Sequence, residues 1–173
     1  MKKCIILPIN YLILICLFIP CVAIAQPICQ IQRFSAYNGL AQRSVTNILQ
    51  DSKGFIWFST WNGLNKFDGY TFKNYKAFPG DGCTLTSNRF AKITQTQTCD
   101  IWCQTYDERV YLFDSRRERF IDILRPYEDQ RHQSYAVQNI YTLPKGISWI
   151  VCNRGAFRID EQIYKPCLLY TSP

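Results

Sequence analysis

Apolar and polar residues alternate in short runs along most of the chain, and no helical spacing of apolar residues is sustained after residue 25. Segment 55–60, with the sequence FIWFST, is typical because aromatic and apolar side chains occupy both of its alternating faces. Such runs are short and end at turn-forming pairs such as Asn62-Gly63 and Asp68-Gly69. This pattern predicts antiparallel β-strands joined by hairpins. The predicted strands are 45–50, 55–60, 64–68, 71–75, 90–95, 100–105, 109–114, 119–123, 137–142, 147–152, 156–160 and 162–164.

The runs repeat with a period near 46 residues, which Trp57, Trp102 and Trp149 mark. Each tryptophan is followed at nearly the same distance by an aspartate, and these are Asp68, Asp114 and Asp160. Four short strands per repeat at this period are typical of the blades of a β-propeller. Neighbouring blades cover both faces of such a sheet, which explains strands that are apolar on both sides. We therefore predict an all-β, partial β-propeller with three blades and the tryptophans in its core. The predicted blades are about 45–75, 90–123 and 137–164.

Three blades are fewer than the roughly four that a closed ring needs, so we expect the chain to be the N-terminal part of a larger propeller. Residues 33–37 resemble the predicted outer strand at 71–75. We expect them to form a lone outer strand of the kind that completes the last blade of a ring. Residues 165–173 leave the repeat pattern, and we interpret them as an off-pattern tail of non-native sequence, with a divergent loop as the alternative. The predicted propeller segment is therefore 26–164.

The N-terminal segment 1–25 has the plan of a secretory signal peptide. Two lysines precede an apolar run, and Ala23-Ile24-Ala25 forms a small-x-small cleavage site. An uncleaved membrane anchor is the alternative, but two prolines and an asparagine interrupt the run, and a span needs roughly 20 apolar residues. We expect cleavage before Gln26 and export of the remaining chain.

Charge and cysteine content exclude several classes of site. The net charge is +7, but the one basic cluster, 116–119, falls in a predicted hairpin turn, so we expect no nucleic-acid partner. Of nine cysteines, three lie in the signal segment, and we interpret most of the others as small core side chains. Cys99 and Cys103 would lie roughly 13 Å apart in an extended strand, too far for a disulfide. With a single histidine and no C-x-x-C pair, the sequence predicts no metal site and no cofactor.

The segment GFIWFSTWNGLNKFDGYTFKNY (54–75), with YNGL (37–40) and SVTNILQD (44–51) before it, is similar to the two-component regulator propeller repeat. Blades two and three match more loosely, because Asp100 and Arg109 stand where the repeat favours glycine. The resemblance implies the periplasmic sensor region of a hybrid two-component histidine kinase of Bacteroidota. It also implies further blades, a second propeller, an inner-membrane helix and a kinase domain in the full-length protein. The resemblance suggests oligosaccharides as the ligands and a homodimer as the assembly of the full-length receptor.

The repeated aspartates suit turns, because an Asx side chain bonds its own backbone there, and no nucleophile motif or phosphate loop stands out. We therefore expect no enzymatic activity from this segment. Binding is expected in the loops where the repeats differ, which are the turns between the second and third strands. The candidate ligand-binding residues are Trp61, Asn62, Asp107 and Arg154. A secreted propeller enzyme, such as a lyase, is the alternative function, since the fold alone does not choose between the two.

Overall fold

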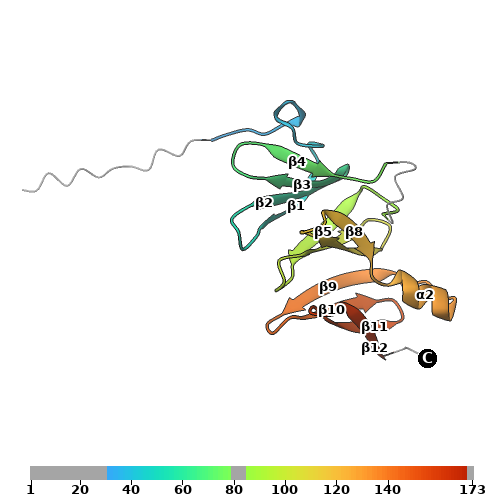
Figure 1. Cartoon of the computed structure of the whole chain (residues 1–173). Helices are drawn as coiled ribbons and strands as arrows, with labels where there is room; N and C mark the ends of the chain where they lie inside the picture. The colour runs from blue at the N-terminus through green and yellow to red at the C-terminus, as the bar shows by residue number, and fades with distance from the viewer. Residues whose placement is uncertain (1–30, 79–84, 171–173) are drawn as a thin grey trace, which may run out of the picture. The chain divides into compact units, whose positions relative to one another are not determined.

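The structure is a computed structural model that describes residues 31–78 and 85–170. The predicted signal peptide lies outside these residues. The chain divides into two units, 1–33 and 34–173, and the elements below belong to the second. In its described part, twelve strands form three four-stranded antiparallel sheets (Figure 1). This architecture is the predicted partial propeller, and each sheet is one blade.

Each blade is a meander in which consecutive strands pair with their neighbours. Blade one contains β1 (Val45–Gln50), β2 (Ile56–Thr60), β3 (Gly63–Phe67) and β4 (Phe72–Tyr75). Blade two contains β5 (Phe90–Gln95), β6 (Ile101–Thr105), β7 (Val110–Asp114) and β8 (Arg119–Asp122). Blade three contains β9 (Val137–Leu143), β10 (Ile147–Cys152), β11 (Gly155–Asp160) and β12 (Lys165–Tyr170). Except for β12, every strand lies within one residue of its predicted bounds.

The repeated aspartates have the structural role that the sequence predicts. Asp68 accepts hydrogen bonds from the N–H groups of Tyr70 and Thr71. Asp114 accepts them from Arg116 and Arg117 in the equivalent turn of blade two. The N–H groups of Thr71 and Tyr70 lower the pKa of Asp68. Each carboxylate thus holds the turn between the third and fourth strands of its blade.

The core lies between adjacent blades. Trp57 is 2 % exposed and packs with side chains of blade two, including Phe113, whose ring centroid lies 5.6 Å away. Trp102 is fully buried against blade three, where its Nε1–H donates to the Ser148 hydroxyl at 2.9 Å. Trp149, at the same repeat position in blade three, is only partly buried. Each tryptophan therefore packs against the following blade where a following blade is described.

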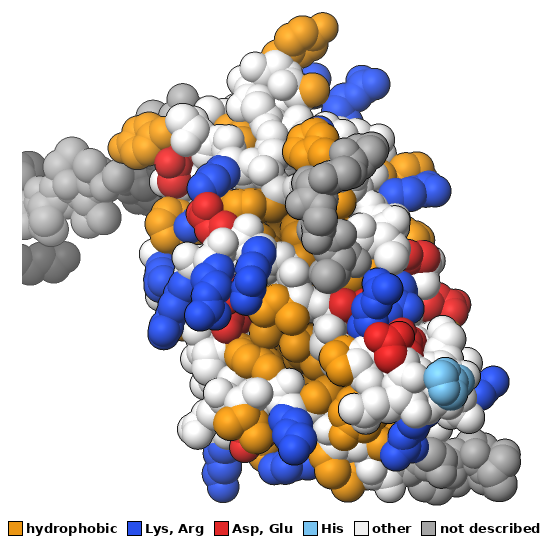
Figure 2. All heavy atoms as spheres, turned by 45° about the vertical axis from the view of Figure 1, so that its right-hand side comes forward, with side chains coloured by type: hydrophobic (Ala, Val, Ile, Leu, Met, Phe, Trp, Pro, Cys, Tyr) orange, Lys and Arg blue, Asp and Glu red, His pale blue; other side chains and the backbone are white. Residues whose placement is uncertain are grey.

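Hydrophobic side chains also remain on the surface, where Figure 2 shows them beside groups of basic side chains. Leu143 and Leu169 of blade three are 44 % and 53 % exposed. Both alternate along their strands with residues that pack against blade two, so they point to the other face of the sheet. The face of blade three that carries Trp149 is thus the less covered of its two faces.

The fourth strand of blade three differs from the prediction. The prediction placed it at 162–164 and treated 165–173 as a tail outside the propeller. Residues 161–164 instead form a turn, and β12 pairs with β11 through a register that begins at Asp160 and Lys165. The turn equals the 115–118 turn of blade two in length, and both end on a residue with positive φ, Tyr164 or Glu118. Repeat geometry, rather than the apolar pattern, therefore sets where the strand begins.

Two further elements were not predicted. Residues 33–37 contain no strand; Ala36–Asn38 form the short 3-10 helix η1 instead. Phe34 makes edge contacts with Phe67 and Phe72 at 4.9 and 5.4 Å between ring centroids, so it packs on blade one without pairing. The connector after blade two, for which no helix or strand was predicted, contains the helix α2 (Arg125–Arg131).

The cysteines divide by burial. Cys103 and Cys152 are buried as predicted, and burial raises the pKa of the Cys152 thiol to about 12. Cys99 is half-buried, and Cys167 is exposed on β12, so Cys167 does not fill the core. All four thiols are free, and Cys29 and Cys83 lie outside the described residues.

Candidate ligand-binding face

The turns between the second and third strands of the blades share one local structure. In each blade, the first residue of this turn donates its backbone N–H to the carbonyl of the residue just before the first strand. The three bonds join Trp61 to Ser44, Tyr106 to Arg89 and Asn153 to Ala136. We call the surface formed by these turns and the connectors beside them the second-turn face. The common bond places side chains of equivalent turn positions on one face.

An aromatic and cationic cluster lies on the second-turn face across blades one and two. The rings of Trp61 and Tyr106 meet edge to face with centroids 6.1 Å apart. The Arg89 guanidinium carbon lies 4.7 Å from the Trp61 ring centroid and 5.9 Å from that of Tyr106. Trp61 remains 42 % exposed and Tyr106 53 %. Two large rings are therefore held by a cation and still offer surface to solvent.

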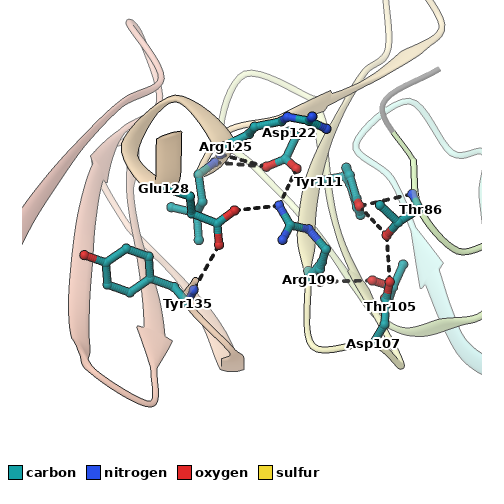
Figure 3. A network of polar contacts seen from close by, with 10 residues as sticks. Thr86, Thr105, Asp107, Arg109, Tyr111, Asp122, Arg125, Glu128 and Tyr135 are labelled. Carbon is teal, nitrogen blue, oxygen red and sulfur yellow. Dashed lines mark hydrogen bonds and ion pairs between the residues drawn. The ribbon is translucent and has the colours of Figure 1, made fainter. Parts of the chain in front are cut away.

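Of the four predicted residues, Trp61 belongs to this cluster, and Asn62 and Asp107 follow its members Trp61 and Tyr106 in the chain. Asn62 is half-buried as the second residue of the β2–β3 turn, where its N–H donates to the Thr60 hydroxyl at 3.1 Å. Asp107 accepts a 2.6 Å hydrogen bond from the Thr86 hydroxyl, which also contacts the Tyr111 hydroxyl at 2.8 Å (Figure 3).

Arg154 is exposed in the β10–β11 turn of blade three. Within the described residues, its guanidinium has no hydrogen bond or ion pair. The candidate site is thus centred on blades one and two, and Arg154 belongs to the next turn along the same face.

The sequence analysis missed Tyr106 and Arg89 as site residues. Tyr106 follows Trp102 by the same number of residues as Trp61 follows Trp57, so the repeat alignment could have found it. Arg89 could not be found in this way, because it is the residue before β5 and neither other blade has a cation there. Its role follows from the ring contacts alone.

An ion-pair network supports the neighbouring part of the face (Figure 3). The Arg109 guanidinium contacts Asp122 at 2.7 Å and Glu128 of α2 at 2.8 Å. Glu128 also accepts the Tyr135 N–H at 2.9 Å, and Asp122 accepts the Arg125 N–H at 3.0 Å. Burial opposes the charge on Arg109, but its hydrogen bonds to Asp122 and Glu128 raise its pKa on balance.

Arg109 thus remains charged and ties the β6–β7 turn to α2. Arg109 occupies the repeat position that Gly63 has in blade one. In blade two, the arginine at this position anchors the helix α2 through Glu128. The network is structural, because both carboxylates already hold protein donors.

The described residues contain no group of His, Cys, Asp and Glu side chains placed to hold a metal ion. Among the same residues, no helix is long and apolar enough to cross a membrane.

Known proteins share the repeat and the blades. Residues 39–62 match the family described as Two component regulator propeller. A 53-residue stretch is 47 % identical to Histidine kinase P4 of Formosa agariphila and covers 31 % of this chain and 4 % of that protein. The chain therefore spans a small part of this relative.

Solved structures agree with this match. The extracellular domain of a putative hybrid two component system from B. thetaiotaomicron is 26 % identical, with a TM-score of 0.64, over 80 % of this chain and 20 % of that one. A second such domain from the same organism, 16 % identical with a TM-score of 0.61, shows the same fold over 82 % of this chain and 18 % of that one.

The fold thus defines a set of propeller blades of the type found in the extracellular domains of hybrid two-component systems. More particularly, residues 39–62 match the two-component regulator propeller family that the sequence predicted, and the chain is similar to the extracellular domains of hybrid two-component systems.

Proposed function

We propose that this chain is part of the periplasmic ligand-sensing propeller of a hybrid two-component histidine kinase, and that it binds an oligosaccharide on the second-turn face. The exposed cluster of Trp61, Tyr106 and Arg89 carries the proposal. It lies where the repeats differ in sequence, while the tryptophan core positions stay alike. The similarity to extracellular domains of two-component systems supports the sensing role.

The chemistry of the cluster suits a sugar ligand. An indole and a phenol offer flat apolar surfaces against which the C–H groups of a sugar ring can pack, and the phenol also offers a hydroxyl group for hydrogen bonding. Arg89 supplies donors for hydroxyl or carboxylate groups, because within residues 31–78 and 85–170 its guanidinium contacts only the two rings. Asn62, Asp107 and Arg154 extend the polar surface along the turns. Blade three has Asn153 in place of an aromatic residue, so stacking is confined to blades one and two.

The proposal includes the rest of the signalling protein. Further blades and a second propeller would complete the sensor, a downstream helix would tether it to the inner membrane, and a homodimer would carry the signal to the kinase. The secreted enzyme has no comparable support, because the repeated aspartates Asp68 and Asp114 hold backbone N–H groups of their own turns.

Calorimetric titration of the full chain with a panel of oligosaccharides tests the binding face. Trp61→Ala and Tyr106→Ala should each weaken binding about 5- to 150-fold, as loss of a binding anchor of roughly 1–3 kcal/mol does. Tyr70→Ala is the matched control, because Tyr70 is 92 % exposed in the β3–β4 turn. This turn lies at the opposite end of β3 from Trp61. Wild-type binding by both cluster variants would refute this face as the site.

A further inference from the structure

A pocket of about 370 Å³ lies between blades two and three, on the face formed by the first and third turns of the blades. It is separate from the Trp61 cluster, which lies at the opposite ends of the strands. Its lining combines side chains of β7 and β8 with the turns of both blades. The lining residues are Thr98, Asp100, Leu112, Asp114, Arg116, Arg117, Ile121, Glu161, Gln162 and Tyr164.

The corresponding region between blades one and two contains a larger pair of side chains. In the repeat alignment, Phe55 and Lys66 of blade one occupy the positions of Asp100 and Leu112 in blade two. The Lys66 ammonium lies 3.7 Å from the centroid of the Phe55 ring and 5.5 Å from that of the Trp57 ring. Asp100 and Leu112 are smaller than this stacked pair. The sequence change between the two repeats therefore leaves room where the first interface is packed.

The acidic groups of the pocket are already bonded to the protein. Asp100 accepts the Ser115 N–H at 2.9 Å and the Tyr164 hydroxyl at 2.8 Å. Glu161, which is fully buried, accepts the Gln97 N–H at 2.7 Å and the Ser148 hydroxyl.

Asp114 accepts two turn N–H groups and the guanidinium of Arg117 at 3.2 Å. Each carboxylate of the pocket thus accepts hydrogen bonds from the protein. A ligand does not need to supply hydrogen-bond donors to these groups.

The basic groups differ. The Arg116 guanidinium has no hydrogen bond or ion pair in the described part of the chain, and Arg117, 70 % exposed, holds only Asp114. Leu112, Ile121 and the Tyr164 ring form the apolar wall.

We propose that this pocket is a binding site for a small organic anion with a flat apolar body. Its acidic group pairs with Arg116, and its body packs on Ile121 and the Tyr164 ring. Burial, together with Asp100, raises the pKa of Tyr164 to about 12, so its hydroxyl keeps its proton and remains bonded to Asp100 at neutral pH.

Benzoate and benzamide are matched probes, because they share the ring and differ in charge. Saturation-transfer NMR and calorimetric titration of the full chain should detect benzoate and should find benzamide bound at least several-fold more weakly. Arg116→Gln should weaken benzoate binding about tenfold, since it removes a charge-assisted hydrogen bond.

Arg119→Gln is the control, because it makes the same change of charge on an exposed arginine of blade two that does not line the pocket. As a second test, Ile121→Trp should fill the pocket and abolish benzoate binding with an unchanged circular dichroism spectrum. Equal binding of benzoate and benzamide, equal effects of the two arginine variants, or no binding of either probe would each overturn the proposal.

Discussion

The two blade interfaces of this chain use the same backbone and the same tryptophan position but different surrounding chemistry. Between blades one and two, Trp57 stacks among aromatic rings, and Glu118 reaches from blade two to Lys73 and Tyr75 of blade one. Between blades two and three, the tryptophan packs mainly among aliphatic side chains, and Tyr164 reaches back to Asp100.

Glu118 and Tyr164 occupy the same position of the same turn, and both have positive φ. In each case, this turn position places a side chain in contact with the preceding blade. The residue type decides whether the contacting group is a carboxylate or a phenol. The repeat preserves how one blade docks on the next and leaves the polar groups at the rim free to vary. The pocket between blades two and three is one result of that freedom.

The largest expected effect is on the free energy of unfolding, and it should differ among the three tryptophans of the repeat. Trp57→Ala and Trp102→Ala should each destabilise the chain by about 3–5 kcal/mol, because they leave large cavities between blades. Trp149→Ala should cost clearly less, because its side chain is partly exposed. Urea unfolding followed by far-UV circular dichroism measures all three variants. An equal loss for Trp149→Ala would mean that its face is covered in solution.

A smaller difference in stability is expected between variants of the acidic residues at the two interfaces. Glu161→Ala should cost roughly 1–3 kcal/mol, because it leaves the buried Ser148 hydroxyl and the Gln97 N–H without their acceptor. Glu118→Ala should cost about 0–1 kcal/mol, as exposed ion pairs do, because its pair with Lys73 is open to solvent. The same urea titration measures both, and a larger loss for Glu118→Ala would reverse the assignment of the buried acid.

The smallest effect is a pH dependence of the first interface. Lys73, followed by Tyr75, lowers the pKa of Glu118 from its ordinary value of 4.5. A carboxylate whose pKa is lower in the folded state stabilises the fold above the unfolded pKa and loses this contribution as pH falls. Stability should therefore decline below pH 4.5, and Glu118→Gln should make this decline shallower. Thermal unfolding over a pH series tests this, and an unchanged slope in the variant would contradict it.

Local sequence was sufficient for most of the architecture. The tryptophan spacing, the alternating apolar runs and the Asx turns predicted three blades and eleven strands to within a residue, because strand pairing within a meander depends on neighbours close in sequence. The same repeat alignment placed Trp61 on an exposed second turn, and the structure confirms its exposure.

Contacts between distant residues decided the rest. The helix α2 and the packing of Phe34 depend on partners such as Arg109 and Phe72, whose positions no local pattern encodes. The start of β12 follows instead from the length of the turn after β11, against the apolar pattern. Arg89 joins Trp61 across two blades, and the pocket exists because Leu112 and Tyr164, from different blades, meet without filling the space between them. Periodicity along the chain specifies which segments become strands, whereas the volume left between two packed sheets depends on both sheets at once.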